Sequence, residues 1–161
     1  MKKHSAGIVL YRIVDEQLSV LLVHPGGPFW AKRDLGAWSI PKGEYDEGEG
    51  EDALAAALRE LTEETGLKLG DVALIPLDAV KQKNGKVVTA WAAEHDFDVT
   101  TLVSNTFEME WPKGTGVREF PEVDRAAWFA PDDARRKLVA AQAEFVDRLI
   151  TKLHETRHDL P

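Results

Sequence analysis

Runs of apolar residues near the N-terminus predict two paired strands. Residues 6–14 (AGIVLYRIV) and 18–24 (LSVLLVH) are rich in β-branched and aliphatic side chains, and the polar residues 15–17 separate them. Short apolar runs bounded by polar turn residues are typical of strands. We therefore predict a β-hairpin, followed by a Gly/Pro-punctuated loop. A further short strand is expected at 38–40, ending before Pro41, which cannot donate to a ladder.

One central segment has strong helical periodicity. Residues 52–65 place Leu54, Leu58 and Leu61 at i, i+4 and i+7, an apolar stripe beside helix-favouring alanines. Asp52 is a candidate N-cap, and Gly66 can adopt the left-handed conformation that ends many helices. The sequence thus predicts a helix with a defined start, a buried face and a defined end.

The remaining chain predicts further strands and two terminal helices. Residues 98–122 mix Pro, Gly and aromatic residues over a length unusual for a structureless loop, so we expect function or a short helix there. Asn84-Gly85 favours a type I′ hairpin turn, and Pro131 suits the first turn of a helix. Strands are expected at 71–80, 85–97 and 124–129, and helices at 132–139 and 141–155.

This order of elements predicts the fold class and the domain organisation. Strand pairs separated by one helix, then more strands and terminal helices, indicate an α/β or α+β sandwich with helices flanking a mixed sheet. A length of 161 residues with 43% hydrophobic content suits one compact domain over 1–161. Cysteine is absent, which excludes disulfides and thiolate metal sites and is compatible with a cytoplasmic protein. No stretch approaches the roughly 20 apolar residues that cross a bilayer, so we expect neither membrane insertion nor secretion.

The negative charge is concentrated in one part of the chain. The formal net charge is -8, and residues 41–67 hold nine of the 28 acidic residues but only two basic ones, Lys42 and Arg59. An acidic surface repels nucleic-acid backbones, so binding to DNA or RNA is disfavoured. Concentrated carboxylates attract divalent cations instead.

Three glutamates share one face of the predicted helix. Glu60, Glu63 and Glu64 lie at i, i+3 and i+4, within a sector of about 100°. Converging oxygen donors with few competing cations suit Mg²⁺ or Mn²⁺, although a solvated helix face is the alternative. Just upstream, Gly43 permits close backbone approach and can turn its carbonyl toward a metal, while Lys42 offers a cation for phosphate oxygens. The alternative there is an ordinary turn with a solvated lysine.

The segment RELTEETGL at 59–67 resembles the core of the Nudix box: Arg-Glu, an aliphatic, any residue, Glu-Glu, any residue, Gly, an aliphatic. The full box starts with Gly, five residues, Glu and seven residues before this Arg, and the starting Gly here is Gly43. Two residues are extra: counting from Gly43 leads to Glu49, and counting back from Arg59 leads to Glu51. A loop absorbs an insertion more cheaply than a helix, so we favour Glu51, with Glu49 as the alternative.

The resemblance extends over nearly the whole chain and implies a Nudix-type α/β/α sandwich that hydrolyses nucleoside diphosphate derivatives. By matching positions it implies Glu60, Glu63, Glu64 and the Gly43 carbonyl as ligands of Mg²⁺ or Mn²⁺. Glu63, Glu60, Arg59 and Glu51 form the implied catalytic set, in which Arg59 pairs with the box glutamate and orients carboxylates. A general base or further ligand from outside the box has four candidates: Glu108, Glu110, Glu119 and Glu122.

Substrate contacts are less specific in the sequence. Lys42 is the candidate for phosphate, and Trp38 and Trp111 are candidates for clamping a base, with core packing as the alternative for each aromatic residue. Trp30, in a loop, is a further candidate. WSIPKG at 38–43 is similar to the branch that cleaves dinucleoside polyphosphates such as Ap4A.

The sequence is also compatible with several other functions. A nucleoside triphosphate, a nucleotide sugar or an inositol pyrophosphate are alternative substrates. A non-catalytic nucleotide-sensing module is a rival from another class, and a structural module with an acidic helix, which would need no metal, ranks last. The expected partner is a small-molecule nucleotide, and the chain is expected to be a monomer or a homodimer.

Overall fold

The structure is a computed structural model that describes residues 4–46 and 50–156. Its centre is a mixed six-stranded sheet in the order β4-β5-β1-β2-β8, with β3 pairing beside β1. The elements in chain order are β1 (His4–Val14), β2 (Gln17–Pro25), β3 (Lys42–Glu44), α1 (Ala53–Thr65), β4 (Leu74–Lys81), β5 (Val87–Glu94), η2 (Val99–Thr101), β6 (Thr106–Glu110), β7 (Val117–Pro121), β8 (Val123–Phe129), α2 (Pro131–Lys137), η3 (Ala140–Gln142) and α3 (Ala143–Thr156).

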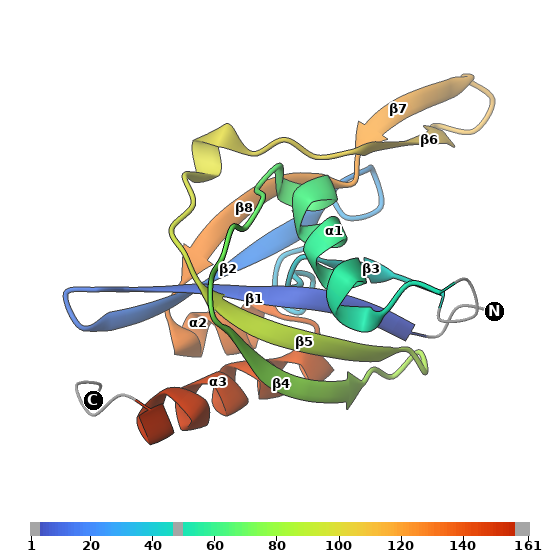
Figure 1. Cartoon of the computed structure of the whole chain (residues 1–161). Helices are drawn as coiled ribbons and strands as arrows, with labels where there is room; N and C mark the ends of the chain where they lie inside the picture. The colour runs from blue at the N-terminus through green and yellow to red at the C-terminus, as the bar shows by residue number, and fades with distance from the viewer. Residues whose placement is uncertain (1–3, 47–49, 157–161) are drawn as a thin grey trace.

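Helices cover both faces of this sheet, as the sequence predicts. Helix α1 lies on one face, and α2 and α3 lie on the other (Figure 1). Each face has its own apolar cluster: Leu61 of α1 belongs to one, and Phe145 and Leu149 of α3 belong to the other. In the described part of the chain, no helix is both long enough and apolar enough to cross a membrane.

The predicted N-terminal hairpin is present. Strands β1 and β2 are antiparallel, and Val14 faces Gln17, so Asp15 and Glu16 form a two-residue turn. Both turn residues have positive φ, 51° and 64°, which is the geometry of a type I′ turn. The hairpin gives β1 its central place, because β1 also pairs in parallel with β5.

Helix α1 has the predicted ends but a different buried face. The Asp52 side chain accepts a hydrogen bond from the Ala55 N–H, and Gly66 has φ +86° and donates to the Thr62 carbonyl. The core side of the helix is centred on Ala56, Ala57 and Leu61, while Leu54 lies outside the apolar clusters. The predicted leucine stripe is therefore only partly right, because small alanines let the helix approach the sheet closely.

Two local predictions around the sheet are wrong. Residues 38–40 form no strand, only isolated bridges at Trp38 and Ser39, and the strand begins after Pro41 as β3. At the β4–β5 turn, Gly85 donates to the Gln82 carbonyl at 2.9 Å, and of Asn84-Gly85 only Gly85 has positive φ. This is a type I turn followed by a left-handed glycine, and the longer loop removes the need for a type I′ turn.

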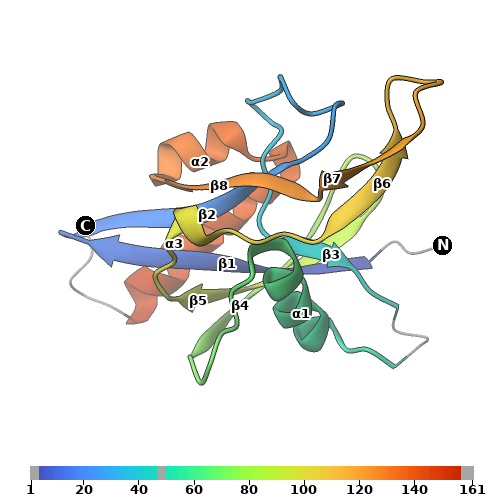
Figure 2. The ribbon, with the colours of Figure 1, turned by 90° about the horizontal axis from the view of Figure 1, so that it is seen from above.

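Residues 98–122 contain regular structure that the sequence did not indicate. The short helix η2 agrees with the expectation for this segment, but β6 and β7 form a separate two-stranded hairpin, with Thr106 facing Pro121 and Glu110 facing Val117. Figure 2 shows this hairpin projecting away from the main sheet. After β8, helix α2 begins at Pro131 as predicted, and η3 separates it from α3.

Candidate active site

The acidic face of α1 is turned toward β3, not toward open solvent. Glu60 is only 8% exposed and lies directly against Gly43. A Cβ atom placed on Gly43 would come within 2.0 Å of the Glu60 carboxyl carbon. The missing side chain at Gly43 is thus what allows a carboxylate of the helix to rest on the strand.

Arg59 joins three carboxylates and one backbone carbonyl through one guanidinium group. Its Nε and Nη2 atoms donate to the two oxygens of Glu51 at 2.7 and 3.0 Å. Nη1 donates to Glu60 at 2.5 Å and to Glu63 at 2.8 Å, and Nη2 also reaches the Glu44 carbonyl at 3.4 Å. These acceptors raise the pKa of Arg59 above its already high value. The guanidinium therefore fixes the carboxylates relative to one another.

Glu64 lies beside β3. Its carboxylate accepts the backbone N–H of Lys42 at 3.2 Å. Burial, together with the nearby charge of Glu60, raises the pKa of Glu64 to about 8. The pKa of Glu60 is also raised, first by burial and then by the charge of Glu63. Burial lowers the pKa of the Lys42 ammonium.

An open cleft of about 200 Å³ begins at Glu64 and Lys42. Apolar side chains form much of its wall, and one exposed aromatic ring, Trp30, stands at its edge. The lining residues come from β2, the loop after it, β8 and the segment around η3: Val23, Pro25, Trp30, Ala37, Ser39, Lys42, Glu64, Gln82, Glu122, Val123, Val139 and Gln142. Carboxylates, a lysine and apolar walls thus meet in one concave site.

The sequence matches the NUDIX domain family over residues 1–149. The chain belongs to the Nudix family. Among curated proteins it is similar to the asymmetrical bis(5'-nucleosyl)-tetraphosphatase of Rattus norvegicus, with 38% identity over 73 residues. That match covers 42% of this chain and spans 48% of the relative's length.

Solved structures agree with the fold of a Nudix protein. A binary complex of the C. elegans Ap4A hydrolase superposes with a TM-score of 0.65 at 22% identity, covering 94% of this chain and 98% of that one. The NUDIX domain of Shewanella oneidensis NrtR, complexed with ADP ribose, gives 0.61 at 20% identity, with 95% and 89% covered. A structure of NrtR complexed with a 27mer DNA gives 0.60 at 20% identity, covering 96% of this chain and 63% of that one.

The Nudix box can now be placed on the structure. Its helical part is α1, and its first glycine, Gly43, lies in β3. Arg59 contacts Glu51 in the manner expected of the box glutamate. Glu49, the alternative, lies outside the described residues. The two extra residues fall in the segment before α1, where a change of length does not rotate the helix.

The box carboxylates have the chemistry of a divalent-cation site. In residues 4–46 and 50–156, no three His, Asp or Glu side chains converge on a single point, because Glu60 and Glu63 turn to Arg59 and Glu64 turns to the Lys42 N–H. The oxygen donors nevertheless fit a hard ion. Burial, followed by the charge of neighbouring glutamates, raises the pKa of Glu60 and Glu64, and a nearby cation would favour their ionised forms. The approach of Glu60 to Gly43 also brings donors of α1 and β3 together.

Of the four glutamates outside the box, the structure brings one to the cleft. Glu122 lines it, and burial together with the charge of Glu63 raises the Glu122 pKa. Its backbone is joined to α1 through Asn105, which accepts the Glu122 N–H and donates to the Glu63 carbonyl, both at 2.8 Å. The other three are exposed on the β6–β7 hairpin: Glu108, Glu110 and Glu119.

The candidate aromatic residues differ in their burial and in their distance from the cleft. Trp38 is only 4% exposed, and its indole packs edge-on against His24 and Phe129 and donates to Asp34. The ring therefore lies in the core, which is the alternative given for each aromatic residue, and its role at the substrate stays a prediction. Trp111 is 41% exposed at the end of the β6–β7 hairpin and contacts Phe29, while Trp30 lines the cleft.

Sequence reasoning missed a buried amide cluster beside the cleft. Gln142 is fully buried and donates to Gln82 at 3.0 Å and to Ser39 at 3.1 Å, while its own oxygen accepts the Ile40 N–H. Gln142 follows a break between two helices, a weak signal that the sequence does offer. These contacts anchor η3 to the strand side of the cleft.

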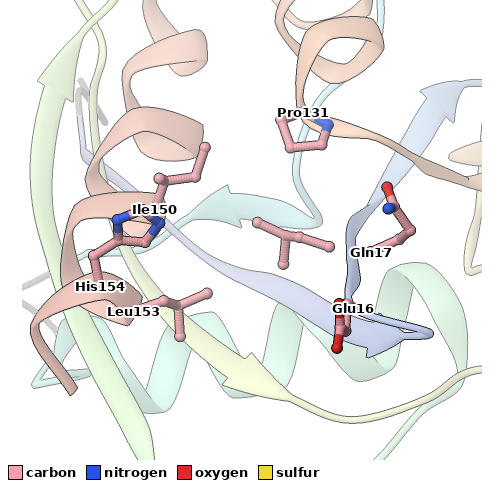
Figure 3. A pocket seen from close by; sticks show the side chains of 7 residues that line it. Glu16, Gln17, Pro131, Ile150, Leu153 and His154 are labelled. Atoms are coloured by element: carbon pink, nitrogen blue, oxygen red, sulfur yellow. The ribbon is translucent and has the colours of Figure 1, made fainter. Parts of the chain in front are cut away.

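A second, more apolar pocket lies elsewhere on the molecule. Figure 3 shows it between the β1–β2 turn and the helices α2 and α3, with Leu18, Ile150 and Leu153 among its lining residues. Glu16 and His154 stand at its rim, but none of the Nudix-box residues contributes to it. The box residue Glu64 lines the cleft beside α1 instead.

Proposed function

We propose that this Nudix protein is a metal-dependent hydrolase of a diphosphate linkage in a nucleoside diphosphate derivative. A dinucleoside polyphosphate such as Ap4A is the first candidate substrate, supported by the similarity to the rat tetraphosphatase and by the WSIPKG segment. The observation that carries the proposal is the Arg59 fork, which holds the carboxylates of Glu51, Glu60 and Glu63 together, with Glu60 against Gly43. Glu64 of the same helix lines the cleft.

Different residues of the site would bind the metal ion, orient the carboxylates and bind the phosphate. Glu60, Glu63, Glu64 and the Gly43 carbonyl would hold Mg²⁺ or Mn²⁺, the kind of divalent ion that Nudix hydrolases use. A bound divalent cation supplies positive charge that neutralises the diphosphate oxygens and favours attack by water. Arg59 would keep three carboxylates oriented while they exchange partners. Lys42 lines the same cleft and would offer its ammonium to a phosphate oxygen.

Glu122 is the best-placed candidate for the general base. It lines the cleft opposite α1, and its raised pKa makes it a stronger proton acceptor than an ordinary exposed carboxylate. Glu63 is the alternative within the box. The leaving nucleotide would lie against the apolar wall formed by Val23, Pro25 and Val123, with Trp30 and Trp111 available for base stacking.

A nucleotide-sensing module is the second candidate. The NUDIX domain of NrtR was determined with ADP ribose, and NrtR, of which this match covers 63%, was determined with a 27mer DNA. For this chain, the intact set of box glutamates favours hydrolysis, and the net charge of -8 disfavours binding to nucleic acid. A nucleoside triphosphate or a nucleotide sugar would be the alternative substrate, and the cytoplasm is the expected compartment.

The test is release of phosphate or nucleotide from Ap4A, Ap6A, dNTPs, ADP-ribose and nucleotide sugars, with Mg²⁺ and with EDTA. Turnover should require Mg²⁺ and should fall about 100-fold or more in Glu63→Gln. Glu155→Gln, an exposed glutamate of α3, is the matched control and should keep wild-type activity. Nucleotide binding without turnover of any compound would contradict the hydrolase and favour the sensing module.

A further inference from the structure

A buried histidine behind the cleft has two hydrogen-bond acceptors and no donor among its partners. His24, at the end of β2, is fully buried. Its Nδ1 lies 2.9 Å from Asp124 Oδ1, and its Nε2 lies 2.7 Å from the Arg33 carbonyl oxygen. A neutral imidazole carries one N–H, so it can satisfy only one of two acceptors. The imidazolium form satisfies both.

Charged and aromatic groups surround the imidazole. The Asp124 carboxylate is about one-third exposed and also lies 3.5 Å from Arg125 Nε. The edge-on ring of Trp38 lies with its centroid 5.2 Å from that of His24. The charged groups of the surrounding elements are Asp124 and Arg125 of β8, Arg33 and Asp34 of the loop, and Lys137 of α2, which pairs with Asp34.

His24 connects three parts of the cleft wall. Its neighbours in sequence, Val23 and Pro25, line the cleft from β2. Asp124 directly follows Val123, which lines the cleft from β8. The Arg33 N–H donates to the Trp30 carbonyl at 2.9 Å, so the loop turn that carries Trp30 is the turn that His24 holds. The histidine itself has no contact with the box carboxylates among its hydrogen bonds.

We propose that protonated His24 is a positioning residue that holds the loop 26–37 against β8 and thereby sets the place of Trp30 at the cleft. If the ring loses one proton, a nitrogen lone pair faces an acceptor oxygen, and one of the two contacts must open. Opening of the Arg33 contact would release the turn beneath Trp30. Nucleotide affinity then falls as pH rises, while the chemical step at α1 changes less. The affinity part of this inference rests on the proposed function.

The first measurement does not depend on activity. ¹⁵N-detected NMR of the histidine rings between about pH 5 and pH 8 should show both nitrogens of His24 protonated at the acidic end. Trp30 fluorescence, isolated by comparison with Trp30→Phe, should change together with loss of that proton. A His24 ring with one unprotonated nitrogen at every pH in this range would overturn the inference.

Two variants then distinguish the effect of the His24 proton from the effect of His24 packing. In Asp124→Asn the amide N–H can donate to Nδ1, so a neutral ring can still donate to Arg33. The pH dependence of the Trp30 signal should disappear, and that of KM should keep only the part due to the cleft glutamates. His24→Gln carries both donor N–H groups on one nitrogen atom and cannot bridge Asp124 and Arg33, so KM should rise about tenfold with kcat little changed. The exposed-site control is His154→Gln, in the pocket of Figure 3, which should match the wild type.

The outcomes distinguish this inference from the proposed function. If the wild type hydrolyses nothing, binding of a non-hydrolysed nucleotide replaces KM, and the NMR and fluorescence tests still decide the role of His24. If Asp124→Asn and His24→Gln both keep the wild-type pH profile of affinity, His24 is only a packing residue and the inference is wrong.

Discussion

Gly43 is the residue at which a small change in local geometry should disturb the candidate active site most directly. A Cβ atom at this position would overlap the Glu60 carboxylate, which lies between α1 and β3. Gly43→Ala should therefore displace the Glu60 carboxylate from β3 and reduce turnover at least tenfold, with a smaller effect on the free energy of unfolding, because the Glu60 side chain can change rotamer. Gly70→Ala is the matched control, because a Cβ there meets nothing within 4 Å. Chemical denaturation and steady-state kinetics measure both effects; equal behaviour of the two variants would contradict the close approach.

Arg59 should matter for activity far more than for stability. Its side chain is 38% exposed, and exposed ion pairs contribute little to the free energy of unfolding. A lysine has one ammonium and cannot bond Glu51 at both oxygens while reaching Glu60 and Glu63. We expect Arg59→Lys to lower metal affinity or kcat by about 10- to 100-fold with a near-normal melting temperature. Arg12→Lys, at the surface pair with Asp96, serves as the control. A parallel loss of stability and activity in Arg59→Lys would argue for a structural role.

At the residue scale, a motif with fixed spacing was predictable, and side-chain environment was not. The pairing of Arg59 with Glu51 follows from counting residues back from the helix, since a helix fixes its own phase. The burial of Trp38 does not follow from the sequence, because an aromatic residue before a lysine-glycine turn suits either a core or a binding surface. Only the position of Phe129 and His24 around its ring decides the question.

At the scale of elements, the strongly capped helix and the apolar hairpin were predictable because their signals are local. Asp52 and Gly66 define the ends of α1, and the turn residues define the β1–β2 register. The hairpin of β6 and β7 escaped prediction because it buries little and its strands are mostly exposed. Its position depends on long-range packing, in which the Phe107 ring lies close to the left-handed Gly27.

That hairpin and the loop 26–37 together should determine substrate affinity. Phe29 of the loop and Trp111 of the hairpin end have ring centroids 5.0 Å apart, so each steadies the other beside Trp30. Trp111→Ala and Trp30→Ala should raise KM by about 5- to 100-fold, with kcat changed less than threefold, because stacking on a base contributes about 1–3 kcal/mol. Val117→Ala, an exposed apolar residue of the same hairpin, is the control. A fall in kcat with constant KM would show that the aromatic pair takes no part in base recognition.

At the scale of the whole molecule, the buried glutamates of α1 make the stability of the protein depend on pH and on bound metal. Glu64 has a pKa of about 8 in the folded protein against an ordinary value of 4.5, so the folded state holds more protons than the unfolded state between these values. Stability then falls as pH rises from about 4.5 to about 8. Without metal, the melting temperature should drop by roughly 5 °C between about pH 6 and pH 8, and less in Glu64→Gln.

Divalent cations should reverse this loss, because they compete with protons for the same carboxylates. Mg²⁺ should raise the melting temperature more at about pH 8 than at about pH 6, where Glu64 and Glu60 are more often protonated. Differential scanning fluorimetry with EDTA and with Mg²⁺ at both pH values measures the four combinations, and Glu155→Gln should behave as wild type. A larger Mg²⁺ effect at the lower pH, or an unchanged effect in Glu64→Gln, would mean that the ion binds outside the α1 carboxylates. The concentrated charge of residues 41–67 would then need another explanation, such as solubility.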